Sequence, residues 1–129
     1  MDYLPIFYRI KQRACLVVGG GAVAARKVSL LRKAGADVVV VAPGLCDELA
    51  QLESEGKIQY RERGYQPSDL DDCVLVIAAT DQREVNERVS ADAKTRHIPV
   101  NVVDNTGLCS FVMPSIIDLT ELDGVLDAW

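Results

Sequence analysis

The sequence is poor in the residues that metal sites and disulfide frameworks require. It contains one histidine, His97, and four cysteines, no two of which form a C-x-x-C pair. Because a zinc site needs closely spaced soft ligands, we expect no metal site built from protein side chains. Cys15 and Cys73 fall inside apolar stretches, where we expect them to pack as small hydrophobic residues.

Long apolar runs and basic stripes are also missing. The apolar stretches are far shorter than the ~20 residues that span a bilayer, and residues 1–5 carry an early acid and no signal pattern. The net charge is -5 at pH 7, and no cluster of Lys and Arg is available to neutralise phosphates. We therefore expect a cytoplasmic protein with no nucleic-acid partner and no membrane association. A chain of 129 residues is most simply one domain.

A glycine turn between two regular stretches is the most informative part of the sequence. Residues 14–18 are apolar and fit a buried strand, whereas residues 22–33 are helix-prone. A G-x-G-x-x-A string begins between these two stretches and ends inside the second one. Its fixed positions are Gly19, Gly21 and Ala24. Gly19 would allow the tight turn, Gly21 would let a pyrophosphate approach, and the helix amides would face that anion. The alternative is a glycine-rich turn that binds nothing.

Strand-like and helix-like stretches alternate along the remainder of the chain. We expect strands at 38–42, 58–61, 73–79, 99–103 and 110–113, helices at 45–55 and 82–96, and one helical turn at 67–70. This alternation predicts an α/β fold with a doubly wound parallel sheet, a Rossmann-type NAD(P)-binding domain. Residues 4–10 form an apolar lead-in that we expect to pack on a sheet edge.

Ligands of such sheets bind beyond the carboxyl ends of the strands. The glycine turn and residues 42–44, 79–81 and 103–105 all follow apolar strands, so we expect these four loops to gather at one edge. The acid that usually holds the ribose is missing, because Val41 and Ala42 end the second strand. The backbone of Pro43 and Gly44 is then expected to hold the ribose, and the choice between NAD and NADP stays open.

Four further polar residues need an interpretation. Thr80 and Asp81 can cap the next helix, and the small residues there can also lie against a cofactor; the two roles are compatible. Asp104 is either a turn residue or a carboxylate that accepts a proton from a substrate beside a nicotinamide. His97 precedes a strand, so we expect it at the surface of the opposite edge.

Five motifs occur in an order that resembles a known family. They read LPIF at 4–7, VVGGG-x-VA-x-RK at 17–27, AATD at 78–81, NVVD at 101–104 and SF-x-x-PS at 110–115. Together they resemble the N-terminal module of siroheme synthase, which stand-alone precorrin-2 dehydrogenase/sirohydrochlorin ferrochelatase proteins share. The resemblance implies a tetrapyrrole substrate and NAD-dependent oxidation of precorrin-2 to sirohydrochlorin, followed in some members by insertion of ferrous iron.

The resemblance also assigns roles to residues. It implies NAD contacts at Ala22 and Val23 in the glycine turn and at Pro43 and Gly44 after the second strand. The essential aspartate of the family matches Asp104, which would act as general base. We therefore expect a cofactor site formed by Gly19, Gly21, Ala22, Val23, Pro43, Gly44 and Thr80, with Asp104 as the catalytic residue.

The family pattern is not followed beyond about residue 118. There the family continues into a Ser/Gly-rich turn and a helical dimerisation region, whereas residues 119–129 differ. We expect residues 1–113 to form the dinucleotide-binding domain and residues 114–129 to be a truncated start of the dimerisation and substrate region. Two functions stay open: an enzyme, as a homodimer in the family, and an NAD-binding module without turnover.

Overall fold

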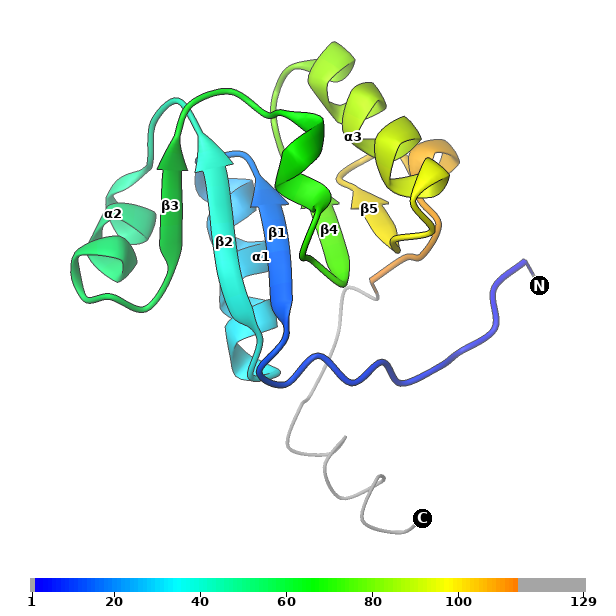
Figure 1. The fold of residues 1–129 in the computed structure, drawn as a ribbon, viewed down its shortest axis with the longest axis horizontal. Helices are drawn as coiled ribbons and strands as arrows, with labels where there is room; N and C mark the ends of the chain where they lie inside the picture. The colour runs from blue at the N-terminus through cyan, green and yellow to red at the C-terminus, as the bar shows by residue number, and fades with distance from the viewer. Residues whose placement is uncertain (1, 114–129) are drawn as a thin grey trace, which may run out of the picture.

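The computed structural model describes residues 2–113, which form a parallel sheet with helices on both faces (Figure 1). The predicted second segment, 114–129, lies outside the described residues. The elements are β1 (Ala14–Val18), α1 (Ala22–Lys33), β2 (Asp37–Ala42), α2 (Asp47–Ser54), β3 (Gln59–Glu62), β4 (Leu75–Ala78), α3 (Arg83–Thr95) and β5 (Val100–Val102), with 3-10 turns η1 (Pro67–Leu70) and η2 (Thr106–Leu108). The five strands follow the order β3-β2-β1-β4-β5, and each neighbouring pair is parallel.

The sheet is apolar on both faces, as expected of parallel strands covered by helices. Successive residues of β1 alternate between two cores: Cys15 and Val17 pack toward α1 and α2, while Leu16 and Val18 pack toward η1 and α3. In β4 the same alternation places Ile77 in the first core and Val76 in the second. Both cores confirm the predicted doubly wound Rossmann-type architecture.

Helix α1 begins where the glycine turn ends. Gly21 is its N-cap without a side-chain cap bond, and no acidic residue occupies the first turn. Arg32 and Lys33 occupy the last turn, where cations are favoured by the helix dipole. Gly35 then takes a φ of +84°, a left-handed conformation that lets the chain reverse into β2.

Two expectations about apolar stretches are wrong. Leu4, Ile6 and Phe7 are exposed by 82%, 72% and 61%, so most of the lead-in does not pack on the sheet. Only its end is anchored, where Ile10 is buried and the Tyr8 hydroxyl donates to the Val74 carbonyl at 3.0 Å. In Figure 1 this segment runs apart from the sheet on the β4–β5 side.

Residues 110–113 do not form a strand. The chain runs beside β5, where the Ser110 amide donates to the Val100 carbonyl at 2.8 Å, but no regular ladder forms and side chains make further contacts. The Val100 amide donates to the Ser110 hydroxyl at 2.8 Å, and the Asn101 side chain donates to the Phe111 carbonyl at 3.2 Å. These contacts cover the outer edge of β5. Within residues 2–113, no helix has the length and apolar character needed to cross a membrane.

Candidate functional site

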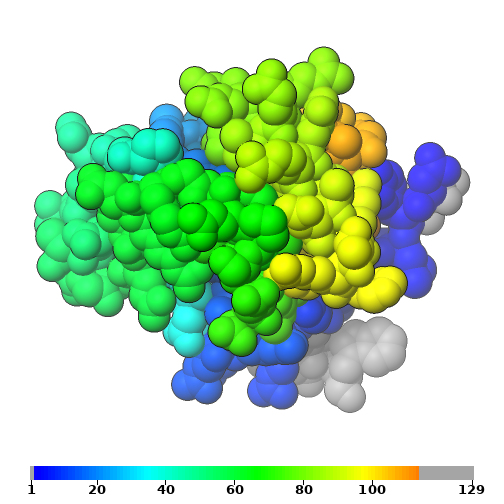
Figure 2. Space-filling view, turned by 45° about the horizontal axis from the view of Figure 1, so that its top comes forward, coloured from blue at the N-terminus to red at the C-terminus, as the bar shows by residue number. Residues whose placement is uncertain are grey.

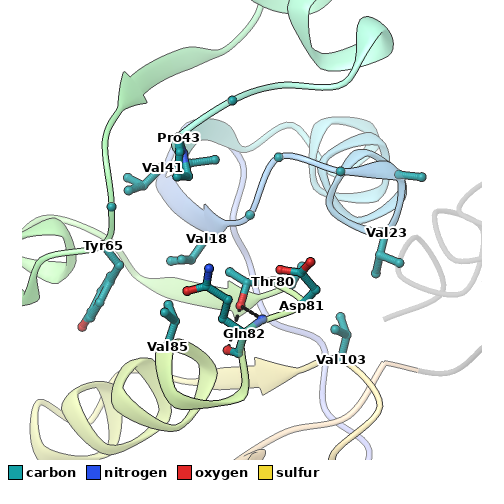
Figure 3. A pocket seen from close by; sticks show the side chains of 18 of the residues that line it. Val18, Val23, Val41, Pro43, Tyr65, Thr80, Asp81, Gln82, Val85 and Val103 are labelled. Atoms are coloured by element: carbon teal, nitrogen blue, oxygen red, sulfur yellow. Dashed lines mark hydrogen bonds between the residues drawn. The ribbon is translucent and has the colours of Figure 1, made fainter.

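One pocket of about 690 Å³ opens at the carboxyl ends of β1, β2 and β4 (Figure 3). The four loops predicted to meet at this edge all contribute to it. Its lining includes every predicted cofactor residue and the predicted catalytic residue: Gly19, Gly21, Ala22, Val23, Pro43, Gly44, Thr80 and Asp104. The prediction that these four loops gather at one edge of the sheet is therefore confirmed.

Two of the three glycines in the turn are required by close backbone contacts. Gly19 has a φ of +132°, and a Cβ there would collide with the Ala79 carbonyl at the end of β4. A Cβ on Gly20 would collide with the carbonyl oxygen of Gly44. Gly20 occupies the variable position of the G-x-G string, so the motif did not single it out. Glycine is required at position 20 because the loop after β2, which is distant in sequence, packs against it.

Gly21 instead faces open space. A Cβ on Gly21 would meet nothing within 4 Å. The Ala25 amide donates to the Gly21 carbonyl at 3.0 Å and closes the first helical turn, so the amides of Ala22, Val23 and Ala24 have no intrahelical acceptor. These amides and the uncompensated helix dipole suit an anion. The turn therefore fits the pyrophosphate of a dinucleotide.

The two ends of the pocket differ in character. Figure 3 shows Tyr65, Val41 and Val85 toward one side and Val103 and Val23 toward the other. The charged side chains that line the described pocket are Asp81 and Asp104, and neither Lys nor Arg lines it. The pocket thus combines an aromatic and aliphatic end with an acidic end, while the glycine turn lies between them.

Thr80 is held by a buried asparagine that the sequence did not indicate. Asn86, in α3, accepts from the Thr80 hydroxyl at 2.7 Å, and its side-chain amide donates to the Thr80 carbonyl at 3.0 Å. The expectation that Thr80 and Asp81 cap α3 is wrong, because the N-cap is Gln82 and has no side-chain cap bond. The Thr80 hydroxyl lies two residues before this N-cap and accepts the Gln82 amide at 3.1 Å. Asparagine has a low helix propensity, so its place inside a predicted helix was the signal in the sequence that could have pointed to this role.

Replacing Asn86 by alanine is expected to lower the free energy of unfolding by about 1–3 kcal/mol, because polar groups of Thr80 lose their partner in a half-buried site. Urea denaturation measures the change. Glu87→Ala is the matched control: Glu87 is exposed and pairs with Arg83 on the surface, so its loss should cost no more than about 0.5 kcal/mol. Equal effects of the two changes would contradict a structural role for Asn86.

Asp104 lies at the rim of the pocket in a tight turn. It is exposed and has a φ of +58°, a conformation that aspartate tolerates better than most residues. The Asn105 amide closes the turn on the Val102 carbonyl at 3.2 Å, and the Cys109 thiol lies 3.3 Å from the Asn105 carbonyl. Asp104 also lines a smaller adjoining hollow of about 260 Å³. Asp104 is thus a turn residue that also lines the pocket, and its role as a proton acceptor stays a prediction.

The remaining candidate side chains lie elsewhere. His97 is exposed just after α3 with a φ of +56°, at the edge opposite the pocket, as expected. Cys15 is buried, and burial raises the pKa of its thiol to about 12, which is the behaviour of a small hydrophobic residue. Among the described residues, no group of three His, Cys, Asp or Glu side chains is placed to hold a metal ion.

Comparison with known proteins relates this chain to an NAD(P)-binding family. The family described as "Putative NAD(P)-binding" matches residues 6–115. Siroheme synthase from Nitrosospira multiformis is 58% identical over 126 residues, which cover 95% of this chain and 27% of that protein. Siroheme synthase from Thioalkalivibrio sulfidiphilus is 58% identical over 122 residues, which cover 95% of this chain and 25% of that protein. The chain thus spans about a quarter of the length of these relatives.

A solved structure agrees with the sequence relatives. SirC, precorrin-2 dehydrogenase, superposes with a TM-score of 0.75 at 25% identity, covering 90% of this chain and 57% of that chain. The comparisons confirm both the expected resemblance to the N-terminal module of siroheme synthase and the Rossmann-type fold.

Proposed function

The chain belongs to the NAD(P)-binding family that matches residues 6–115, and from this membership we propose that it is an NAD-dependent module that oxidises precorrin-2 to sirohydrochlorin. The observation that carries the proposal is one pocket lined by both the glycine turn and Asp104. Relatives named siroheme synthase and a structural neighbour named precorrin-2 dehydrogenase support the choice of reaction.

The residues present suit a dinucleotide. The amides of Ala22 and Val23 would hold the pyrophosphate at the N-terminus of α1, and the backbone of Pro43 and Gly44 would hold the ribose beyond β2. Thr80 would form the wall opposite the glycine turn, fixed in place by Asn86. When bound, the nicotinamide supplies the two-electron acceptor for the oxidation.

Asp104 is the chain's own reacting group in this proposal. Oxidation removes two electrons and two hydrogens from the substrate, one hydrogen leaving with the electron pair and the other as a proton. The carboxylate of Asp104 takes that proton as general base. Its exposed position at the rim, beside the smaller hollow, lets it reach a substrate that is too large to enter the pocket.

We expect this chain to bind NAD at least about tenfold more tightly than NADP, a difference of about 1.4 kcal/mol. The 2′-phosphate of NADP needs a nearby cation, whereas no Lys or Arg lines the described pocket. Arg63, which lies beside Gly64, is already paired with Asp69. Titration calorimetry with both cofactors at one ionic strength measures the ratio. Tighter binding of NADP would contradict this assignment.

The alternative is an NAD-binding module without turnover. Anaerobic incubation with precorrin-2 and NAD separates the two functions, because only an enzyme forms reduced nicotinamide in proportion to the substrate consumed. Binding of NAD with no reduced nicotinamide would favour the module, and it would remove Asp104 from a catalytic role in this chain.

A further inference from the structure

A buried aspartate organises the loop that follows β3. The Asp69 side chain is fully buried and accepts from Arg61 Nη1 at 2.9 Å, from Arg63 Nη2 at 2.6 Å and from the Gln66 amide at 2.8 Å. Burial alone would raise the pKa of Asp69, but the hydrogen bonds from Arg63, Gln66 and Arg61 outweigh it and hold the pKa below its ordinary value. We call Asp69 with Arg61 and Arg63 the Asp69 cluster.

The segment held by this cluster carries two residues of the pocket, Gly64 and Tyr65. Arg63 Nη1 donates to the Gly64 carbonyl at 3.1 Å, and the Gln66 amide donates to Asp69, so the backbone is fixed on both sides of Tyr65. In Figure 2 this part of the chain, coloured green, lies against the yellow-green helix α3.

Tyr65 is in turn fixed by α3. Its hydroxyl donates to Asp92 Oδ2 at 2.7 Å, and its carbonyl accepts from Arg88 Nη2 at 3.2 Å. The Arg88 guanidinium lies 5.5 Å from the centre of the Tyr65 ring, and Tyr65 is only 7% exposed. Burial, then the hydrogen bond to Asp92, raises the pKa of Tyr65, so the phenol stays protonated and remains a donor. Little freedom is left to the ring.

The position of Tyr65 identifies the part of the cofactor that it faces. Asp104 follows β5 and Tyr65 follows β3, and these two strands are the opposite edges of the sheet. The glycine turn follows β1, which is the central strand. A pyrophosphate on that turn and a nicotinamide near Asp104 leave the adenosine half at the end with Tyr65, Val41 and Val85. An aromatic and aliphatic surface suits a planar base.

We propose that the Asp69 cluster is a positioning device that sets the affinity of the site for the adenosine half of the dinucleotide, by holding Gly64 and Tyr65 in place. The inference rests on the proposed binding of NAD. A buried ion pair is a weak source of stability, because removing charges from water offsets much of their attraction, but it selects one arrangement of the loop. The cluster affects cofactor binding without touching the cofactor.

The test compares Asp69→Asn with Asp71→Asn by calorimetry, using NAD, ADP-ribose and nicotinamide mononucleotide. Asp71 ends the same 3-10 turn, but its carboxylate is 61% exposed and pairs with Arg96 at the surface. Asp69→Asn should weaken NAD and ADP-ribose alike, by about five- to thirtyfold, and leave nicotinamide mononucleotide unchanged. Asp71→Asn should change none of the three.

Arg63→Gln and Arg63→Lys provide a second pair if Asp69→Asn does not fold. Lysine keeps the charge beside Asp69 but loses the two-pronged contact, so its ADP-ribose affinity should fall between wild type and Arg63→Gln. A folded variant with wild-type ADP-ribose affinity, or with equal losses for both half-molecules, would overturn the inference. If the wild-type chain bound neither NAD nor ADP-ribose, both the proposed function and this inference would fail.

Discussion

Asp104→Asn is expected to reduce precorrin-2-dependent formation of reduced nicotinamide by about 10²–10⁴-fold, the range that a general base contributes. Asparagine accepts the left-handed conformation that Asp104 adopts at a φ of +58°, so the turn should keep its shape. NAD affinity and the unfolding temperature should therefore stay at wild-type values. Steady-state kinetics, calorimetry and thermal unfolding of the same preparation measure the three quantities.

Asp81→Asn is the matched control for this change. Asp81 is the other carboxylate that lines the pocket, and it lies at the same sheet edge. If loss of negative charge alone slowed the reaction, the two variants would be affected alike. We expect Asp81→Asn to cost far less turnover, and turnover that survives Asp104→Asn would show that another group accepts the proton.

Gly20→Ala is expected to lower the free energy of unfolding by about 2–4 kcal/mol, a large part of the 5–15 kcal/mol typical of a domain. The new Cβ would collide with the Gly44 carbonyl and come within 3.0 Å of the Ala42 Cβ. These atoms belong to a backbone that is itself fixed, because the Cys46 amide donates to the Gly20 carbonyl at 2.7 Å. The loops after β1 and β2 would have to separate. Urea denaturation measures the loss.

Gly21→Ala is the neighbouring control. Nothing lies within 4 Å of its added Cβ, and its φ of -93° is ordinary for alanine, so stability should change by no more than about 0.5 kcal/mol. The same methyl group would stand where a pyrophosphate approaches α1, so NAD affinity should fall. Equal stability of the two variants would contradict the close contact described at Gly20.

The fold was predictable because its signals are local. Buried parallel strands are short apolar runs, and β1 and α1 have the bounds that the sequence indicated. The same rule misled at residues 4–10 and 110–113, which are apolar enough to suggest packing. An apolar run can join a sheet only where an edge strand has backbone groups free to pair with it. At the outer edge of β5, the amides of Val100 and Val102 already donate to the side chains of Ser110 and Cys109.

The site was predictable only as a set of loops. Strand ends placed the glycine turn and Asp104 at one edge, since parallel strands share a direction. Sequence reasoning missed Asn86, Tyr65 and Gly20, because their roles come from contacts with residues in other loops or elements. Tyr65, for example, donates to Asp92, which lies in the helix after the next strand. No local pattern records such a pair.

A crystal structure of this chain with NAD tests the central claim most directly. We expect the pyrophosphate on the amides of Ala22 and Val23, the adenine beside Tyr65 and the nicotinamide toward Asp104. A cofactor bound away from the glycine turn, or one whose nicotinamide lies at the Tyr65 end, would contradict it.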